Sequence, residues 1–233
     1  MSIGTDYFGL LENLVTKRTN NFDYLKRLHE GEVYWLNIVS LTQTDISSFY
    51  TNSQTILRTR TNLFFFLGLS LGPFLQIPNG PNYLQSLASL FEEYSSEFKV
   101  RRFKKIKLNV GDDTQTVKSK TFLSDDSNIN YQFLILPKVN TSKFDYFQVI
   151  FALFDLLTHC YRKFLDPSCE NQQCYEAIVS IDNWISGLIL NPILEEIEKI
   201  ANNILFKRLS SFDPMFQEVV KKKEIDYDTS NKN

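Results

Sequence analysis

The densest group of charged side chains in the sequence is a run of six cations within nine residues, interleaved with apolar residues. These cations are Lys99, Arg101, Arg102, Lys104, Lys105 and Lys107. Such a run can bind a partner protein or the phosphates of an anionic membrane or of nucleic acid. The same run arises where a helix end, whose dipole favours cations, leads into a strand with lysine on its solvent face. We favour this solvated face and keep the binding patch as the alternative.

The charge balance of the whole chain is unfavourable for binding nucleic acid. Lys and Arg number 25 while Asp and Glu number 27, so the formal net charge is −2. Asp112 and Asp113 follow the basic run closely and lower its positive potential. We therefore expect other proteins as partners, with an anionic membrane as the alternative and nucleic acid disfavoured.

A second group of side chains has the donor atoms that a zinc ion prefers. His159, Cys160, Cys169 and Cys174 lie within sixteen residues of one another. Adjacent helical residues such as His159 and Cys160 point about 100° apart, however, and the cysteine spacing lacks the Cys-x-x-Cys pair that orients two thiolates on one ion. We expect free thiols without a metal. We also expect no disulfide, because the chain carries no export signal.

No pattern in the sequence indicates an enzyme. A Gly-rich phosphate loop, a nucleophile elbow and a metalloprotease motif are all missing, and nothing near His159 would orient it as the base of a cysteine nucleophile. Paired acids are typical of turns and polar helix faces, and they occur at Glu92 and Glu93, Asp112 and Asp113, Asp125 and Asp126, and Glu195 and Glu196. We predict a non-catalytic protein without a cofactor.

Long segments with helical periodicity would position these side chains. The most apolar of them, Ser142–Leu165, has apolar side chains on two sides, which is typical of a central helix, and Ser142 with Asp145 resembles a capping box at its start. The low numbers of glycine and proline, 8 and 7, disfavour an all-β fold. The sequence predicts a mainly-α bundle with helices at Tyr7–Leu28, Val33–Leu71, Tyr83–Val100, Phe144–Leu165 and Tyr175–Leu209, the last kinked at Pro192.

Between the third and fourth helices the apolar period changes from helical to alternating. Ile106, Leu108 and Val110 alternate with polar residues, and two further strand-like runs follow, Val117–Leu123 and Tyr131–Pro137. We predict a small antiparallel β insertion at about residues 104–137. Residues 1–216 then form a single domain, and residues 217–233 form a disordered charged tail.

The most hydrophobic run, Leu63–Leu75, raises the question of a membrane. It is 13 residues long and broken by Gly72 and Pro73, whereas a transmembrane helix needs about 20 residues. We interpret it as a buried helix end, with a membrane-surface segment as the alternative. The first residues lack the features of a signal peptide, so we expect a cytoplasmic location.

These observations favour a scaffold or adaptor subunit that binds partner proteins through helical faces or the β insertion. The aromatic content of 14% agrees with this, because aromatic side chains are enriched at interfaces. The alternative is a peripheral membrane protein that binds anionic lipid through Lys99–Lys107 and the Leu63–Leu75 run. The sequence also leaves open whether the bundle holds a small-molecule pocket.

Overall fold

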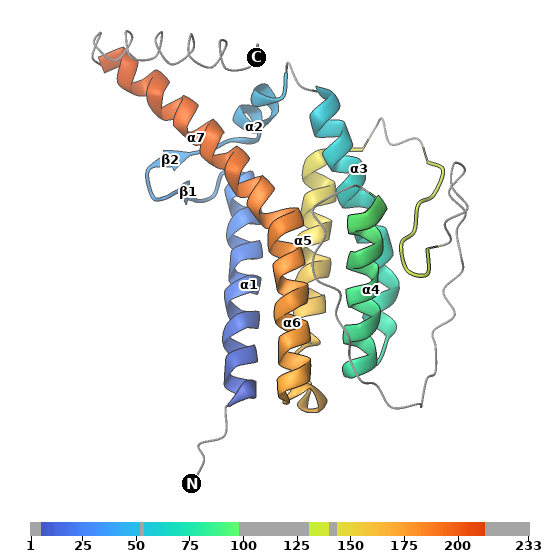
Figure 1. Cartoon of the computed structure of the whole chain (residues 1–233). Helices are drawn as coiled ribbons and strands as arrows, with labels where there is room; N and C mark the ends of the chain where they lie inside the picture. The colour runs from blue at the N-terminus through green and yellow to red at the C-terminus, as the bar shows by residue number, and fades with distance from the viewer. Residues whose placement is uncertain (1–5, 52–53, 98–130, 140–143, 213–233) are drawn as a thin grey trace, which may run out of the picture.

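The computed structural model describes residues 6–51, 54–97, 131–139 and 144–212, and it confirms a mainly-α fold (Figure 1). The small antiparallel sheet of the described residues lies between α1 and α2, not at the predicted insertion. The elements in chain order are α1 (Tyr7–Glu30), β1 (Tyr34–Trp35), β2 (Val39–Ser40), α2 (Gln43–Phe49), α3 (Gln54–Leu71), η1 (Gly72–Gln76), α4 (Pro81–Glu97), α5 (Tyr146–Arg162), η3 (Pro167–Cys169), α6 (Gln172–Ile185), η4 (Ser186–Leu190) and α7 (Asn191–Phe212).

Helix α5 is the centre of the bundle, as its two apolar sides predict. It packs against both α1 and α3, and Ile150, Phe154 and Leu157 on it are buried. The helix begins at Tyr146 because the Asp145 side chain caps it, accepting a hydrogen bond from the Gln148 amide at 3.0 Å. Ser142, the other member of the predicted capping box, lies outside the described residues.

Helix α1 ends where a glycine follows it. Gly31 has a φ of 80°, and its amide donates to carbonyls in the last turn of the helix. Only glycine adopts this left-handed conformation without steric cost, so it is the usual residue after a helix end. The chain then turns away from α1 into the hairpin of β1 and β2.

The prediction of one helix over Val33–Leu71 is wrong. The segment holds the hairpin, the short helix α2 and then α3. Thr42 and Asp45 form a capping box that starts α2, since each side chain accepts from the other residue's backbone amide. Apolar residues three to five positions apart, from Trp35 through Ile38 to Ile46, suggested one helix. They do not share a face, however, because Ile38 is exposed while Trp35 packs against the core and Ile46 is buried.

The predicted third strand, Tyr131–Pro137, is also wrong, because these residues pair with no strand in the described part of the chain. Instead, residues 131–136, which we call the strap, lie along α3 and α4, and side chains of these helices bind four of their amides. The Glu93 carboxylate accepts from three successive amides, and the Ser70 hydroxyl accepts from the Ile135 amide. The other two predicted strands lie outside the described residues.

The apolar run Leu63–Leu75 forms the end of α3 and the start of η1, as a buried helix end would. Phe64, Leu67, Leu71 and Phe74 are all buried. The Lys163 ammonium closes this end of the bundle by donating to the carbonyls of Leu75 and Ile77, at 3.2 and 2.6 Å. Most of the apolar side chains that suggested a membrane segment are therefore packed, fully or partly, in the core.

Helices α6 and α7 are continuous, and the irregularity expected at Pro192 takes the form of a π-helical turn. Proline has no amide hydrogen, so the regular ladder fails there, and Asn191 donates instead to the carbonyl of Ser186, five residues earlier. The joined helix, Gln172–Phe212, is long and apolar enough to cross a membrane, yet more than half of its most apolar stretch is buried inside the fold. A core helix of a globular protein meets the same criterion.

Candidate functional site

The basic run Lys99–Lys107 lies outside the described residues, since α4 is described only to Glu97. This applies to all six of its cations, so the predicted anion- or partner-binding patch stays a prediction. Lys163, directly after α5, is a structural cation that binds carbonyl oxygens and the face of Tyr83, 5.0 Å from the ring centre.

The four soft ligands form no metal centre in the described part of the chain, where no three His, Cys, Asp or Glu side chains are placed to share an ion. Cys160, Cys169 and Cys174 are buried free thiols. Burial raises the pKa of Cys160 to about 11 and that of Cys169 to about 12. Thiols with such pKa values are protonated at neutral pH and are poor nucleophiles and poor metal ligands.

Two of the paired acids have structural partners that the sequence did not reveal. Glu196 on α7 binds Arg60 on α3 and the hydroxyl of Tyr50 at the end of α2, and thereby ties three elements together. Glu93 on α4 holds the strap. Both acids therefore make contacts between elements of the fold.

Two surface hollows are open and lined mainly by polar side chains. One, of about 560 Å³, is lined mostly by hydroxyl and amide groups of α2 and its ends. The other, of about 340 Å³ between α1 and α5, is bordered by the Lys26–Asp155 ion pair. Small-molecule sites are usually enclosed and largely apolar, so neither hollow favours a ligand pocket.

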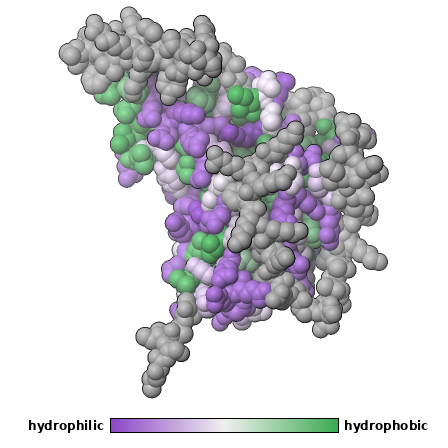
Figure 2. Space-filling model, viewed as in Figure 1, coloured by the Kyte–Doolittle hydropathy of each residue, from purple (hydrophilic) through white to green (hydrophobic). Residues whose placement is uncertain are grey.

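The hairpin of β1 and β2 carries the most exposed apolar side chains of any turn in the described region. Tyr34, Leu36 and Ile38, which we call the apolar tip, have exposed fractions of 57%, 68% and 62%. These three residues alternate along the chain with Trp35 and Asn37. Trp35 packs against the core, and Val39 is buried. Figure 2 shows hydrophobic surface at the left edge of the molecule, where Figure 1 places the hairpin.

The backbone of the apolar tip is strained. The Ile38 amide donates to the Trp35 carbonyl at 3.0 Å, which closes a turn whose two central residues, Leu36 and Asn37, have φ values of 49° and 58°. Turns of this kind favour Asn and Gly, whereas a left-handed residue with a large side chain costs about 1–2 kcal/mol. The conformational cost therefore falls on a leucine that gains almost no contact within the fold.

The root of the hairpin is held firmly and is acidic. The Tyr24 hydroxyl donates to the Tyr34 carbonyl at 3.1 Å, and α7 packs on β2. Glu30 and Glu32 are exposed at the end of α1, and Arg27 lies 3.3 Å from Glu32. The apolar tip therefore projects from a fixed base with an excess of negative charge.

His29 lies below the hairpin, in the last turn of α1, among aromatic rings. Its Nδ1 is 2.7 Å from the Leu25 carbonyl oxygen, so this nitrogen carries the proton, and Tyr146, Phe147 and Phe151 surround the ring. Burial lowers the pKa of His29 from its ordinary value of 6.5. The imidazole is therefore neutral in the folded protein at neutral pH.

We expect this histidine to make stability fall as the pH drops. Below pH 6.5 the unfolded chain takes up a proton at His29 while the folded chain, with its lower pKa, does not, so protons favour unfolding. Urea denaturation at pH 7.5 and pH 5.5 should show a larger loss in the wild type than in His29→Phe, which keeps an aromatic ring in the same surroundings. Equal losses in the two proteins would contradict this assignment.

Sequence reasoning missed the apolar tip because Leu36-Asn37 lacks the glycine that marks most two-residue turns. The signal that was present is the alternation of Tyr34, Leu36 and Ile38 directly after the helix stop at Gly31.

Comparison of the chain with models of protein families, with curated proteins and with solved structures found no match.

Proposed function

We propose that the protein is a non-catalytic intracellular adaptor that binds a partner protein through the apolar tip. The observation that supports this is a strained, solvent-exposed Leu36 with Tyr34 and Ile38 on either side of it, above a base fixed to α1 and α7. Strained backbone persists where the surrounding structure holds it, and it is concentrated at binding and active sites.

The energy available from the apolar tip suits an anchor within a larger interface. Complete burial of one large apolar side chain stabilises by about 1.5–3 kcal/mol, so burying the exposed parts of these three gives roughly 3–5 kcal/mol. Such anchors usually sit at the centre of a protein interface and fill a pocket on the partner. The rest of the affinity would come from contacts around them.

Charge at the root of the hairpin favours a protein partner over an anionic membrane. Glu30 and Glu32 are both exposed just before the hairpin, and Arg27 is the cation paired with Glu32. An anionic lipid surface would repel such a group, whereas a pocket with basic side chains at its rim would attract it. We therefore expect the partner to offer an apolar pocket with a positively charged border.

Leu36→Asn is expected to raise the free energy of unfolding by about 1 kcal/mol, because asparagine adopts a positive φ with less steric cost than leucine. Urea denaturation followed by circular dichroism measures this change. Ile38→Asn is the matched control, since Ile38 has no positive φ and should gain nothing. A Leu36→Asn protein that is no more stable than this control would contradict strain at the tip.

The same substitution tests the function, because it should strengthen the fold while weakening binding. A photo-crosslinking amino acid at position 34, in the native cell, should label one protein selectively, and the same group at exposed Gln173 on α6 should not. With that purified partner, Leu36→Asn is expected to raise Kd at least about tenfold.

Two results would reject this proposal. One is equal labelling from positions 34 and 173, and the other is unchanged affinity of the identified partner for Leu36→Asn. Sedimentation of the wild type with anionic vesicles, without a crosslinked protein, would favour the membrane alternative instead.

A further inference from the structure

Two of the three cysteines lie in one tight turn between α5 and α6. Cys169 ends η3, and Cys174 lies in the first turn of α6. The Cys174 Sγ is 4.0 Å from the carbonyl oxygen of Ser168, the residue before Cys169, and the Cys169 thiol hydrogen-bonds with the Cys174 thiol. The fold therefore holds two thiols in contact, and both are almost fully buried.

The Asn171 side chain fixes the geometry of this turn. Its Oδ1 accepts from the Cys174 amide at 2.9 Å and thereby caps α6. Its Nδ2 lies 3.2 Å from the Ser168 carbonyl oxygen and 3.4 Å from the Cys174 Sγ. On the other side of the turn, the Asp166 carboxylate accepts from the Ser168 amide at 3.0 Å. An N–H donor and a helix N-terminus both favour negative charge on a sulfur in this position.

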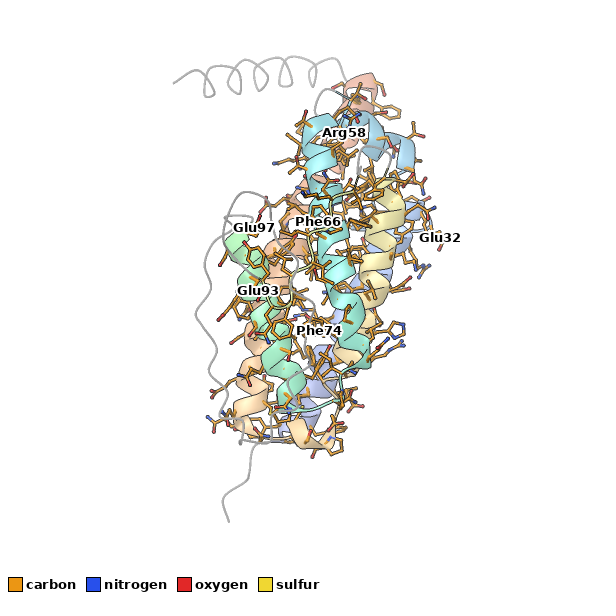
Figure 3. The ribbon with its side chains drawn as sticks, turned by 90° about the vertical axis from the view of Figure 1, so that its right-hand side faces the viewer. Glu32, Arg58, Phe66, Phe74, Glu93 and Glu97 are labelled. Atoms are coloured by element: carbon orange, nitrogen blue, oxygen red, sulfur yellow. The ribbon has the colours of Figure 1, made fainter. Side chains whose placement is uncertain are left out.

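The turn lies at one end of the bundle. Figure 1 shows the start of α6 at the opposite end from the hairpin, and Figure 3 shows α4 rising from the same end to Glu93 and Glu97. The residues around the two cysteines, at positions 167, 168 and 170–173, are exposed. A local opening of this turn is therefore enough to bring a small oxidant to the sulfurs while the bundle stays folded.

We propose that Cys169 and Cys174 are a redox-sensitive pair that hydrogen peroxide oxidises reversibly to a disulfide. The structure shows the reduced state, in which the thiols are free. Disulfides inside cells are usually transient and redox-sensing, which agrees with a pair that is reduced at rest. The disulfide ties η3 covalently to the first turn of α6. This inference does not depend on the apolar tip.

The oxidation takes two steps, and each sulfur has its own role. The Cys174 sulfur attacks one peroxide oxygen and breaks the O–O bond, which gives a sulfenic acid and one water. Burial raises the pKa of Cys169 to about 12, so this thiol keeps its proton until the second step. Its sulfur then attacks the sulfenic sulfur, and its proton leaves with the hydroxyl group as a second water. The thiols lose two electrons and two protons, which the peroxide takes up.

The test treats the folded, full-length chain with a small excess of hydrogen peroxide at neutral pH. Alkylation in denaturant, digestion and mass spectrometry then locate the remaining thiols. We expect the peptide that contains Cys169 and Cys174 to become lighter by two hydrogens at least about tenfold faster than Cys160 loses its thiol. Cys160 is the internal control, because it is completely buried on α5 and lies beside Tyr83 and Lys163 rather than beside a thiol. Glutathione should restore both thiols.

Asn171→Asp tests how the turn positions the pair, because aspartate caps a helix as well as asparagine does. Its carboxylate cannot donate to the Cys174 Sγ and repels negative charge there, so disulfide formation should slow at least about threefold. Gln173→Glu is the matched control, since it adds one negative charge at an exposed position of the same helix turn. It keeps the Asn171 donor and should change the rate by less than about twofold.

Two results on the wild type would overturn the proposal. One is loss of the Cys160 thiol as fast as the loss at Cys169 and Cys174. The other is a pair that stays reduced while free glutathione in the same solution is oxidised. An Asn171→Asp protein that circular dichroism shows to be folded, and that oxidises as fast as the wild type, would overturn the role of Cys174 as the attacking sulfur. If this variant does not fold, the wild-type measurement decides alone.

Discussion

Replacing Asp182 with Asn is expected to lower the free energy of unfolding by about 3–5 kcal/mol, the loss found when one member of a buried ion pair is removed. The Asp182 carboxylate on α6 is only 6% exposed and accepts from Arg18 on α1 through Nε and Nη2, at 2.6 and 2.7 Å. It also accepts from the buried Tyr161 hydroxyl on α5 at 2.6 Å. One carboxylate therefore joins three helices.

The charge on Asp182 is what satisfies both of its partners. Its hydrogen bond is the main cause that raises the pKa of Arg18, while burial and then Asp182 raise the pKa of Tyr161 well above its ordinary value. Asparagine keeps the shape of the side chain but turns an N–H toward one of these donors, and leaves the Arg18 charge without its counter-ion.

Asp155→Asn is the matched control, because Asp155 pairs with Lys26 at the surface at 2.9 Å with exposed fractions of 61% and 31%. An exposed pair of this kind contributes less than about 1 kcal/mol. Urea denaturation at pH 7 compares the two variants. An Asp182→Asn loss no larger than that of Asp155→Asn would show that the three-helix network does not hold the fold.

The existence of the helices was predictable because the apolar periodicity of α1, α4, α5 and α6 persists over several turns, and a helical period of that length fits no strand or loop. The helix end at Gly31 and the irregularity caused by Pro192 were predictable, because a single residue decides each of them. The hairpin after Gly31 could not be predicted, because the alternation of Tyr34, Leu36 and Ile38 indicates a hairpin only if a turn is expected at Leu36. Leucine disfavours the positive φ that this turn requires.

The polar contacts of the fold could not be predicted from the sequence either. Glu93 binds the amides of residues that lie 39–41 positions later in the chain, and Arg18 meets Asp182 across 164 positions. The local spacing of residues cannot predict contacts between positions so far apart. Glu92 and Glu93 are equivalent in the sequence, yet only Glu93 binds the strap amides. Identifying them required the positions of α4 and α6 in the bundle.

Glu93→Ala is expected to lower the free energy of unfolding by about 2–4 kcal/mol, since hydrogen bonds to a charged acceptor contribute about 1.5–3 kcal/mol each and three amides lose theirs at once. The loss should stay below the sum of the three, because an opened strap regains water on its amides and the helices beneath it stay folded. Chemical denaturation gives the global value, and hydrogen exchange at residues 132–135 gives the local one.

Glu92→Ala removes the neighbouring carboxylate and is expected to change stability by less than about 0.5 kcal/mol, as surface substitutions usually do. The two variants separate a charge effect on α4 from the specific capture of the strap, since both remove one negative charge from the same turn. If Glu93→Ala and Glu92→Ala destabilise equally, the carboxylate does not hold the strap. A large global loss with unchanged exchange at residues 132–135 would likewise mean that Glu93 acts elsewhere in the fold.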